Sequence, residues 1–83
     1  MIIEVLYFAW VRERVGRSKE TIETDASTVA QLVDELISRE PAYGVAFKDF
    51  SQIKVAVDQE LGDFTTPLIN VREVAFFPPM TGG

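Results

Sequence analysis

The chain has 83 residues, 47% of them hydrophobic and 25% charged, and it contains neither cysteine nor histidine. This size and composition predict one globular domain with a real core and no room for a second module. The lack of cysteine excludes disulfides, thiolate nucleophiles and Cys-ligated zinc, and the lack of histidine removes the commonest general base, so we do not expect the chain to catalyse a reaction on its own. A net charge of −5 disfavours binding to nucleic acid or an anionic membrane and favours a basic protein partner.

The chain opens with an apolar segment, residues 2–8, that predicts a central strand. It is rich in β-branched and aromatic residues, and its alternation places Ile3, Val5 and Tyr7 on one face. The opposite face carries Ile2, Glu4, Leu6 and Phe8. No basic stretch precedes this segment and a carboxylate interrupts it, so we expect neither a signal peptide nor a membrane span, and a cytoplasmic location is the default expectation.

The next two segments give weaker signals. Residues 9–18 contain Gly16 and scattered charges, which is compatible with a helical turn. Within them, Arg12 could pair with an acidic residue of a partner, although a solvated turn explains it equally well. Residues 19–24 alternate polar side chains around Ile22, a pattern typical of an edge strand.

The clearest pattern in the sequence predicts an amphipathic helix over residues 27–40. Apolar residues at the i, i+3, i+4, i+7 and i+8 positions form one buried stripe, made of Val29, Leu32, Val33, Leu36 and Ile37. Thr28 and Gln31 match a capping box, in which each side chain satisfies the other's free backbone N–H, and Pro41 cannot continue the helix. The domain is therefore expected to have one main helix.

The stretch from residue 41 to residue 51 is irregular, and the sequence gives it no role. Its aromatic residues, Tyr43, Phe47 and Phe50, are expected to cover one end of the core. Residues 53–58 then alternate apolar and polar side chains, which predicts a strand with one buried side.

The last part of the domain is expected to contain turns followed by a final strand. Residues 59–73 hold glycine, proline and asparagine at intervals, which predicts turns around a short connecting segment. The final strand covers residues 73–77 and alternates its faces. Val74 and Phe76 are expected to point into the core, whereas Phe77 points the other way and is available to a partner.

In chain order these elements are two strands, one long helix and two further strands. The helix can bury its stripe against one face of a sheet, and the first and last strands can be parallel neighbours because the chain between them is long enough for a crossover. We therefore expect an α+β fold, with a mixed sheet packed on one main helix, for residues 1–77. Residues 78–83 are expected to form an extended tail beyond this domain.

The tail, "PPMTGG", has the properties of a segment that enters a narrow site. Pro78 and Pro79 lack N–H donors and cannot continue the strand. Six extended residues span roughly 20 Å, which is enough to reach into another protein. Gly82 and Gly83 carry no Cβ, so a narrow tunnel could admit them and the terminal carbonyl carbon is open to attack. An idle terminus is the alternative reading of the same two glycines.

A terminal carboxylate needs activation before it can react. It is ionised at neutral pH and is a poor electrophile in that form. Transfer to the α-phosphate of ATP would give an acyl-adenylate, which a sulfur or nitrogen nucleophile can open. The product would be either a C-terminal thiocarboxylate that carries sulfur or an amide bond to another protein.

The closing motif "EVAFFPPMTGG", supported by the opening "VLYFAWVRERVG", resembles the small subunits of molybdopterin synthase, which are ubiquitin-like sulfur carriers with the β-grasp fold. The resemblance implies that a ubiquitin-activating-type enzyme uses ATP to adenylate Gly83, and that a sulfur donor protein then converts the adenylate to a thiocarboxylate. The carrier would deliver this sulfur to cyclic pyranopterin monophosphate, in a complex of two carriers and two large subunits, to build the dithiolene of molybdopterin.

The resemblance also implies roles for the individual residues of the tail. Gly83 would be the reacting residue. The residues inserted into the large subunit would be Met80, Thr81 and Gly82, and those packed against the partner proteins would be Phe77, Pro78 and Pro79. The chain itself would bind no cofactor and no metal, because ATP is used by the activating enzyme and the large subunit supplies the acid–base groups.

Other functions remain open at this point. A sulfur carrier for thiamin synthesis or for tRNA thiolation would use the same activation with a different acceptor. A protein modifier would join Gly83 to lysines of other proteins, and an inert interaction domain would not use the glycines at all. The exposed carboxylates, Glu4, Glu23, Asp58 and Glu73, are most simply a solvated surface, and together they could steer a basic partner.

Overall fold

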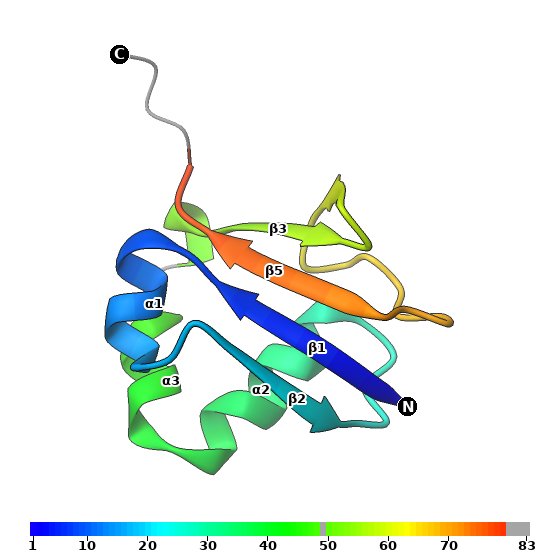
Figure 1. Cartoon of the computed structure of the whole chain (residues 1–83), viewed down its shortest axis with the longest axis horizontal. Coiled ribbons are helices and arrows are strands. Elements are labelled where there is room, and N and C mark those ends of the chain that lie inside the picture. Colours follow the sequence, from blue (N-terminus) through cyan, green and yellow to red (C-terminus); the bar gives the residue numbers. More distant parts are fainter. Residues whose placement is uncertain (49, 80–83) are drawn as a thin grey trace.

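The computed structural model of the protein describes residues 1–48 and 50–79. Within these residues the elements in chain order are β1 (Ile2–Tyr7), α1 (Ala9–Val15), β2 (Lys19–Glu23), α2 (Val29–Arg39), α3 (Pro41–Ala46), the 3-10 helix η1 (Phe50–Gln52), β3 (Lys54–Val57), β4 (Glu60–Gly62) and β5 (Glu73–Phe77). One sheet contains all five strands in the order β2-β1-β5-β3-β4. Figure 1 shows that β1 and β5 lie side by side in the middle of this sheet.

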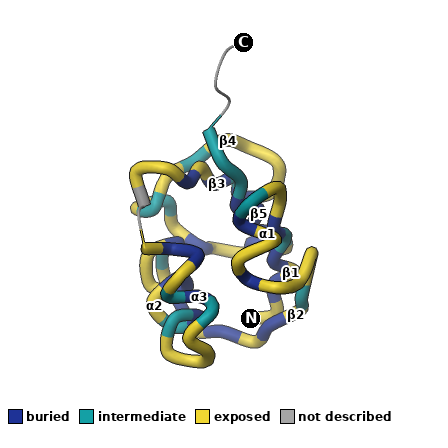
Figure 2. Tube along the Cα trace, turned by 90° about the vertical axis from the view of Figure 1, so that its left-hand side faces the viewer, coloured by how far each residue is buried: buried dark blue, intermediate teal, exposed yellow. Residues whose placement is uncertain are grey.

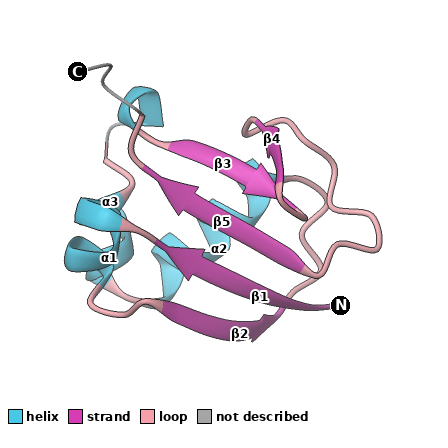
Figure 3. Cartoon of the chain, turned by 45° about the horizontal axis from the view of Figure 1, so that its top comes forward, coloured by secondary structure: helices cyan, strands magenta, loops and turns pink. Residues whose placement is uncertain are grey.

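The sheet is mixed, as predicted. β1 and β5 are parallel, with Val5 opposite Val74 and Tyr7 opposite Phe76, whereas the other neighbouring strands are antiparallel. In Figure 3, α2 lies behind the sheet, and α1 and α3 lie at the end where β1 and β5 finish. This α+β arrangement of a mixed sheet packed on one main helix confirms the predicted β-grasp architecture.

The core fills the space between the sheet and α2. Alternation along β1 buries Ile3, Val5 and Tyr7, and alternation along β5 buries Val74 and Phe76, as expected. The predicted helical stripe is buried at Val29, Leu32, Val33 and Leu36, and Ile37 packs against it while partly buried. Figure 2 shows the two layers from the side, with buried positions on both. Among residues 1–48 and 50–79, no helix covers the other face of the sheet.

The start of α2 is capped as the sequence predicts, with one difference. The Thr28 hydroxyl accepts a hydrogen bond from the backbone N–H of Gln31 at 3.2 Å. The Gln31 side chain, however, accepts from the N–H of Ser27 at 2.8 Å, one residue before the predicted partner. The first bond satisfies a donor that the first turn of the helix leaves free, and the second ties the residue before the N-cap to that turn.

The prediction of an irregular stretch after α2 is wrong in part, because residues 41–46 form the helix α3. Pro41 does end α2, but it also occupies the first turn of α3, where a missing N–H costs nothing. At six residues the helix is too short to show a hydrophobic period in the sequence. The predicted burial of Tyr43 and Phe47 is confirmed. The helical turn expected after β1 is a full seven-residue helix, α1.

The structure also contains a strand that the sequence analysis missed. β4 pairs with β3 through a two-residue connection, Asp58 and Gln59, and both of these residues have positive φ. Such a connection is typical of a tight hairpin, although glycine or asparagine is usual where Gln59 stands. The Asp58 carboxylate then accepts hydrogen bonds from the N–H groups of Arg72 and Glu73, both at 2.9 Å, and so fixes the start of β5.

A partly buried carboxylate ties α3 to the sheet. Glu20 of β2 accepts hydrogen bonds from the hydroxyls of Tyr7, at 2.8 Å, and Tyr43, at 2.5 Å. Arg17 pairs with the same carboxylate at 3.3 Å. Burial and the bond to Glu20 raise the pKa of Tyr7 and raise that of Tyr43 to about 12. The network holds the end of the sheet from which the tail leaves.

Candidate functional site: the last strand and the outer face of the sheet

The tail begins at the end of a central strand. Phe77 is the last residue of β5 and lies opposite Lys54 of β3, and Pro78 and Pro79 follow it half-buried. Met80, Thr81, Gly82 and Gly83 lie outside the described residues. The boundary between domain and tail after residue 77 and the roles of these four residues therefore stay predictions.

The two phenylalanines before the tail point to opposite faces, as expected. Phe76 is 0% exposed, and its ring packs edge-on against Phe47, with 4.9 Å between ring centroids. Phe77 is half-buried on the outer face. The prediction that Phe76 belongs to the core is confirmed, and Phe77 is placed where a partner can reach it.

Phe77 belongs to a strip of apolar side chains across the uncovered face of the sheet. Strand register places Leu6, Ala75, Ala56 and Leu61 in one row across four strands. Phe8, the residue after β1, has extended backbone and follows the same alternation, and its N–H donates to the carbonyl of Phe76, the residue before Phe77, at 3.0 Å. We refer to the six residues Leu6, Phe8, Ala56, Leu61, Ala75 and Phe77 as the outer strip. It meets the tail at Phe77.

Parts of the outer strip are strongly exposed. Leu61 is 76% exposed and Phe8 is 48% exposed. Ala75 is only 7% exposed although it lies outside the core cluster, because its neighbours on the outer face cover it. Large apolar side chains that gather next to a projecting terminus indicate a protein-binding surface.

Leu61 and Phe8 are candidate contact residues that the sequence does not reveal. The alternation of residues 2–8 predicts the correct face for Phe8, but nothing in the sequence shows that this face is uncovered. Leu61 fell in a segment predicted to consist of turns. The one available signal was a lone leucine within the polar segment "QELGD".

Helix α1 adds a basic and aromatic edge beside the strip. It begins directly after Phe8 and carries Trp10, over whose ring the Arg14 guanidinium lies, with 4.4 Å between Cζ and the ring centroid. This distance is typical of a cation–π contact. Arg12 of the same helix is exposed, so the structure leaves it available for the predicted partner contact.

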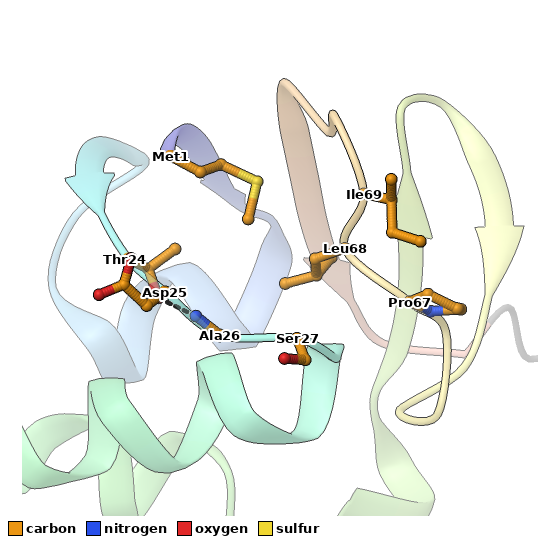
Figure 4. A pocket seen from close by; sticks show the side chains of 8 residues that line it. All are labelled: Met1, Thr24, Asp25, Ala26, Ser27, Pro67, Leu68 and Ile69. Atoms are coloured by element: carbon orange, nitrogen blue, oxygen red, sulfur yellow. Dashed lines mark hydrogen bonds between the residues drawn. The ribbon is translucent and has the colours of Figure 1, made fainter.

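A pocket of about 430 Å³ lies at the other end of the molecule. Met1, before β1, and Thr24, after β2, line it together with the segments 25–27 and 67–69 (Figure 4). Because β1 and β5 are parallel, this end is remote from the point where the tail leaves. Asp25 is the one ionisable side chain in its lining, so the pocket lacks a pair of acid–base groups.

The described residues contain neither a candidate metal site nor a membrane-spanning helix. Within residues 1–48 and 50–79, no group of three or more Asp or Glu side chains is placed to hold a metal ion. In the same part of the chain, no helix is long and apolar enough to cross a membrane.

The fold and the terminus together define the class of protein. A mixed sheet grasping one main helix, with a Gly-Gly end beyond its last central strand, is the arrangement of ubiquitin-like proteins of the β-grasp class. The ThiS family matches residues 5–83 of the chain. The molybdopterin synthase sulfur carrier subunit of Escherichia coli K12 is 40% identical over 82 residues, which cover 99% of this chain and 100% of that protein. The chain belongs to the ThiS family and, within it, to the molybdopterin synthase sulfur carrier subunits.

Solved structures agree with this fold. SAMP1 from Haloferax volcanii is 25% identical and superimposes with a TM-score of 0.80 over 100% of both chains. A protein–protein complex of subunits 1 and 2 of the molybdopterin-converting factor from Helicobacter pylori contains a chain with a TM-score of 0.66 and 20% identity, again over 100% of both chains. At that identity the second match supports the fold alone.

Proposed function

We propose that this protein carries sulfur as a thiocarboxylate on Gly83 and donates it to cyclic pyranopterin monophosphate within molybdopterin synthase. The observation that supports this most directly is the continuity of the outer strip with β5, because Phe77 belongs to both and is followed by the tail. A partner that binds the strip is thereby brought to the base of the tail. Membership of the carrier family supplies the chemistry.

The proposed chemistry has three steps. First, a carboxylate oxygen of Gly83 attacks the α-phosphorus of ATP and pyrophosphate leaves, on a ubiquitin-activating-type enzyme. Second, sulfur at the oxidation level of sulfide, supplied by a donor protein, attacks the carbonyl carbon and AMP leaves. Third, the thiocarboxylate sulfur forms a bond to a side-chain carbon of the pterin precursor while an oxygen substituent of that carbon leaves. Water then cleaves the bond between the carbonyl carbon and sulfur, so that the sulfur stays on the pterin and Gly83 regains its carboxylate. The carrier returns with a carboxylate, ready for a second charge.

In these steps the folded domain would bind the partner proteins and so bring the tail to their active sites. The outer strip, with Pro78 and Pro79, would contact the activating enzyme and then the large subunit, one after the other. Met80, Thr81 and Gly82 would occupy the access to the large subunit's site. Two carriers with two large subunits fit the need for two sulfurs per dithiolene. The chain needs no cofactor of its own, and ATP stays with the activating enzyme.

A second candidate function is attachment to other proteins. The observation that favours it is the likeness, at 25% identity, to SAMP1, whose full name is small archaeal modifier protein 1. The same adenylate at Gly83 would then be opened by a lysine amine instead of sulfur. A proteome-wide search for isopeptides ending in Gly83 distinguishes the two functions, because a carrier forms none. Carriers for thiamin or tRNA thiolation are distinguished by the acceptor.

A single-turnover assay tests the proposed function. The thiocarboxylated protein is mixed with the large subunit from the same organism and cyclic pyranopterin monophosphate, and molybdopterin is measured. We expect product from the full chain and none from a chain that lacks Gly83. The thermal midpoint of that shortened chain should match the wild type within about 1 °C, because the tail lies beyond the core. Failure of the full chain, while the E. coli carrier succeeds with its own large subunit, would refute the proposal.

A further inference from the structure

Charged side chains of opposite sign border the outer strip. Near the tail, Lys54 lies opposite Phe77 and Lys19 lies opposite Leu6. Along β1 and β5, two residues further from the tail than the pair of Leu6 and Ala75, Glu4 lies directly opposite Glu73. Asp58 and Glu23 lie at the same end, and we refer to these four carboxylates as the acidic end. The strand register thus places the two lysines beside the apolar residues, in the same rows, and the carboxylates in a separate row further from the tail; we refer to this pattern as the charge bands.

The pairing of Glu4 with Glu73 is unfavourable for the isolated domain. Like charges directly opposite on neighbouring strands destabilise a sheet. The described salt bridges join Arg17 to Glu20 and Glu40, and Arg39 to Glu35, and none of them includes either carboxylate of this pair. Arg72 borders the acidic end and shares a shallow pocket of about 240 Å³ with Asp58 and Glu73. Glu4 is exposed and Glu73 is half-buried. A pair that costs stability on a binding face indicates a role in binding.

We infer that the acidic end orients the docked partner, which presents lysine or arginine side chains to Glu4 and Glu73 and an acidic group to Lys54. The inference rests on the proposed function and names the chemistry of the surface that the large subunit offers. Apolar contact with the outer strip supplies affinity, but it does not fix the orientation of the docked partner, because the hydrophobic effect is non-directional. The charge bands supply direction, because a partner docked in the reverse sense would meet like charges at both ends.

A charge reversal at one position separates stability from binding. In Glu4→Lys, the new lysine lies opposite Glu73, so a repulsive cross-strand pair becomes an attractive one. We expect the thermal midpoint to rise by about 2–4 °C. We expect association with the large subunit at low ionic strength to slow by about three- to tenfold, and the difference to vanish at high salt.

The matched control is Asp34→Lys, which makes the same change in net charge on an exposed position of α2, the helix behind the sheet. Its association rate should stay within about twofold of the wild type. Stopped-flow mixing with the large subunit from the same organism, across a salt series, measures all three proteins.

Each outcome decides the inference. Slower association of Glu4→Lys alone supports it. Equal slowing of both variants would show that net charge matters and that the acidic end does not, and an unchanged rate for Glu4→Lys would also overturn it. If the wild type itself does not bind the large subunit, the proposed function fails and the inference fails with it. If the wild type binds and transfers sulfur, the function stands whatever the variants show.

Discussion

At the scale of single residues, the carboxylate of Glu20 connects three elements of the domain. Its carboxylate accepts hydrogen bonds from both tyrosines of the chain and pairs with Arg17. These contacts join β1, β2 and α3 at the end of the sheet where the tail leaves. Ionisation of the tyrosine hydroxyls therefore shows whether that end of the fold is intact.

An alkaline titration of the tyrosines tests this network. Burial and the bond to Glu20 raise the pKa of Tyr43 to about 12, and that of Tyr7 is raised as well. Because the folded chain holds these protons more tightly than the unfolded chain, the stabilisation is complete below about pH 10 and is lost as the pH rises toward 12 and above. Ultraviolet absorbance of tyrosinate should therefore show no ionisation near pH 10 until the domain unfolds.

The matched variants are Glu20→Gln and Glu23→Gln, which lie on the same strand. Glu20→Gln removes the charge that opposes ionisation, so the absorbance change should shift to lower pH. Glu23→Gln changes an exposed side chain on the outer face and should leave the titration unchanged. Ionisation of either tyrosine near pH 10 in the folded wild type would contradict the network.

At the scale of elements, β5 has two faces with separate tasks. Phe76 packs in the core, whereas Phe77 on the other face belongs to the outer strip. Phe76→Ala should lower the free energy of unfolding by about 3–5 kcal/mol, the usual loss for a buried aromatic side chain. Phe77→Ala should cost much less stability but weaken binding to the large subunit. Urea denaturation and calorimetric binding measure both, and equal stability losses would refute this division.

Strand β4 places Leu61 in the outer strip. Leu61 is 76% exposed, so Leu61→Ala should leave the thermal midpoint nearly unchanged. Binding to the large subunit should weaken about three- to thirtyfold, mainly through faster dissociation. Ile69 is 75% exposed but lies beside the pocket at the other end, so Ile69→Ala is the control. Similar losses for the two variants would place the contact elsewhere.

How far the sequence predicts these elements depends on their length. The stripe of α2 and the alternation of β1 and β5 are long enough to show a period, and the structure confirms them. α3 and β4 have six and three residues, too few for a period, and tertiary contacts decide their conformation. Of the two hydrogen bonds of the predicted capping box, the one from the Gln31 N–H to Thr28 is confirmed. The Gln31 side chain accepts from Ser27 instead of Thr28, which depends on side-chain geometry that the sequence does not show.

At the scale of the whole molecule, the domain presents one covered and one uncovered face of the sheet. The composition predicts a core, and the terminal motif predicts the chemistry, but the outer strip becomes visible only when strand register brings distant residues into one row. Leu6 and Leu61 are far apart in the sequence and share that row. The charge bands depend on the same register, which no local pattern reveals.

This geometry supports separate roles for the folded domain and the tail. The body is rigid enough to fix the start of the tail, because β5 is hydrogen-bonded on both sides by β1 and β3. Under the proposed function, the reacting carbon at Gly83 would need only the last residues to reach a partner's site, and the outer strip would determine which partners come close. The same surface would serve successive partners because the tail, rather than a pocket, would carry the reactive group.

The most direct test of this account is the intact mass of the protein after incubation with the ubiquitin-activating-type enzyme of the same organism, ATP and a sulfide source. The account predicts an exchange of one oxygen for sulfur, which fragmentation locates at Gly83, and no exchange when ATP is omitted. An unchanged carboxylate, under conditions that charge the E. coli carrier with its own activating enzyme, would contradict it, as would sulfur found at any other residue.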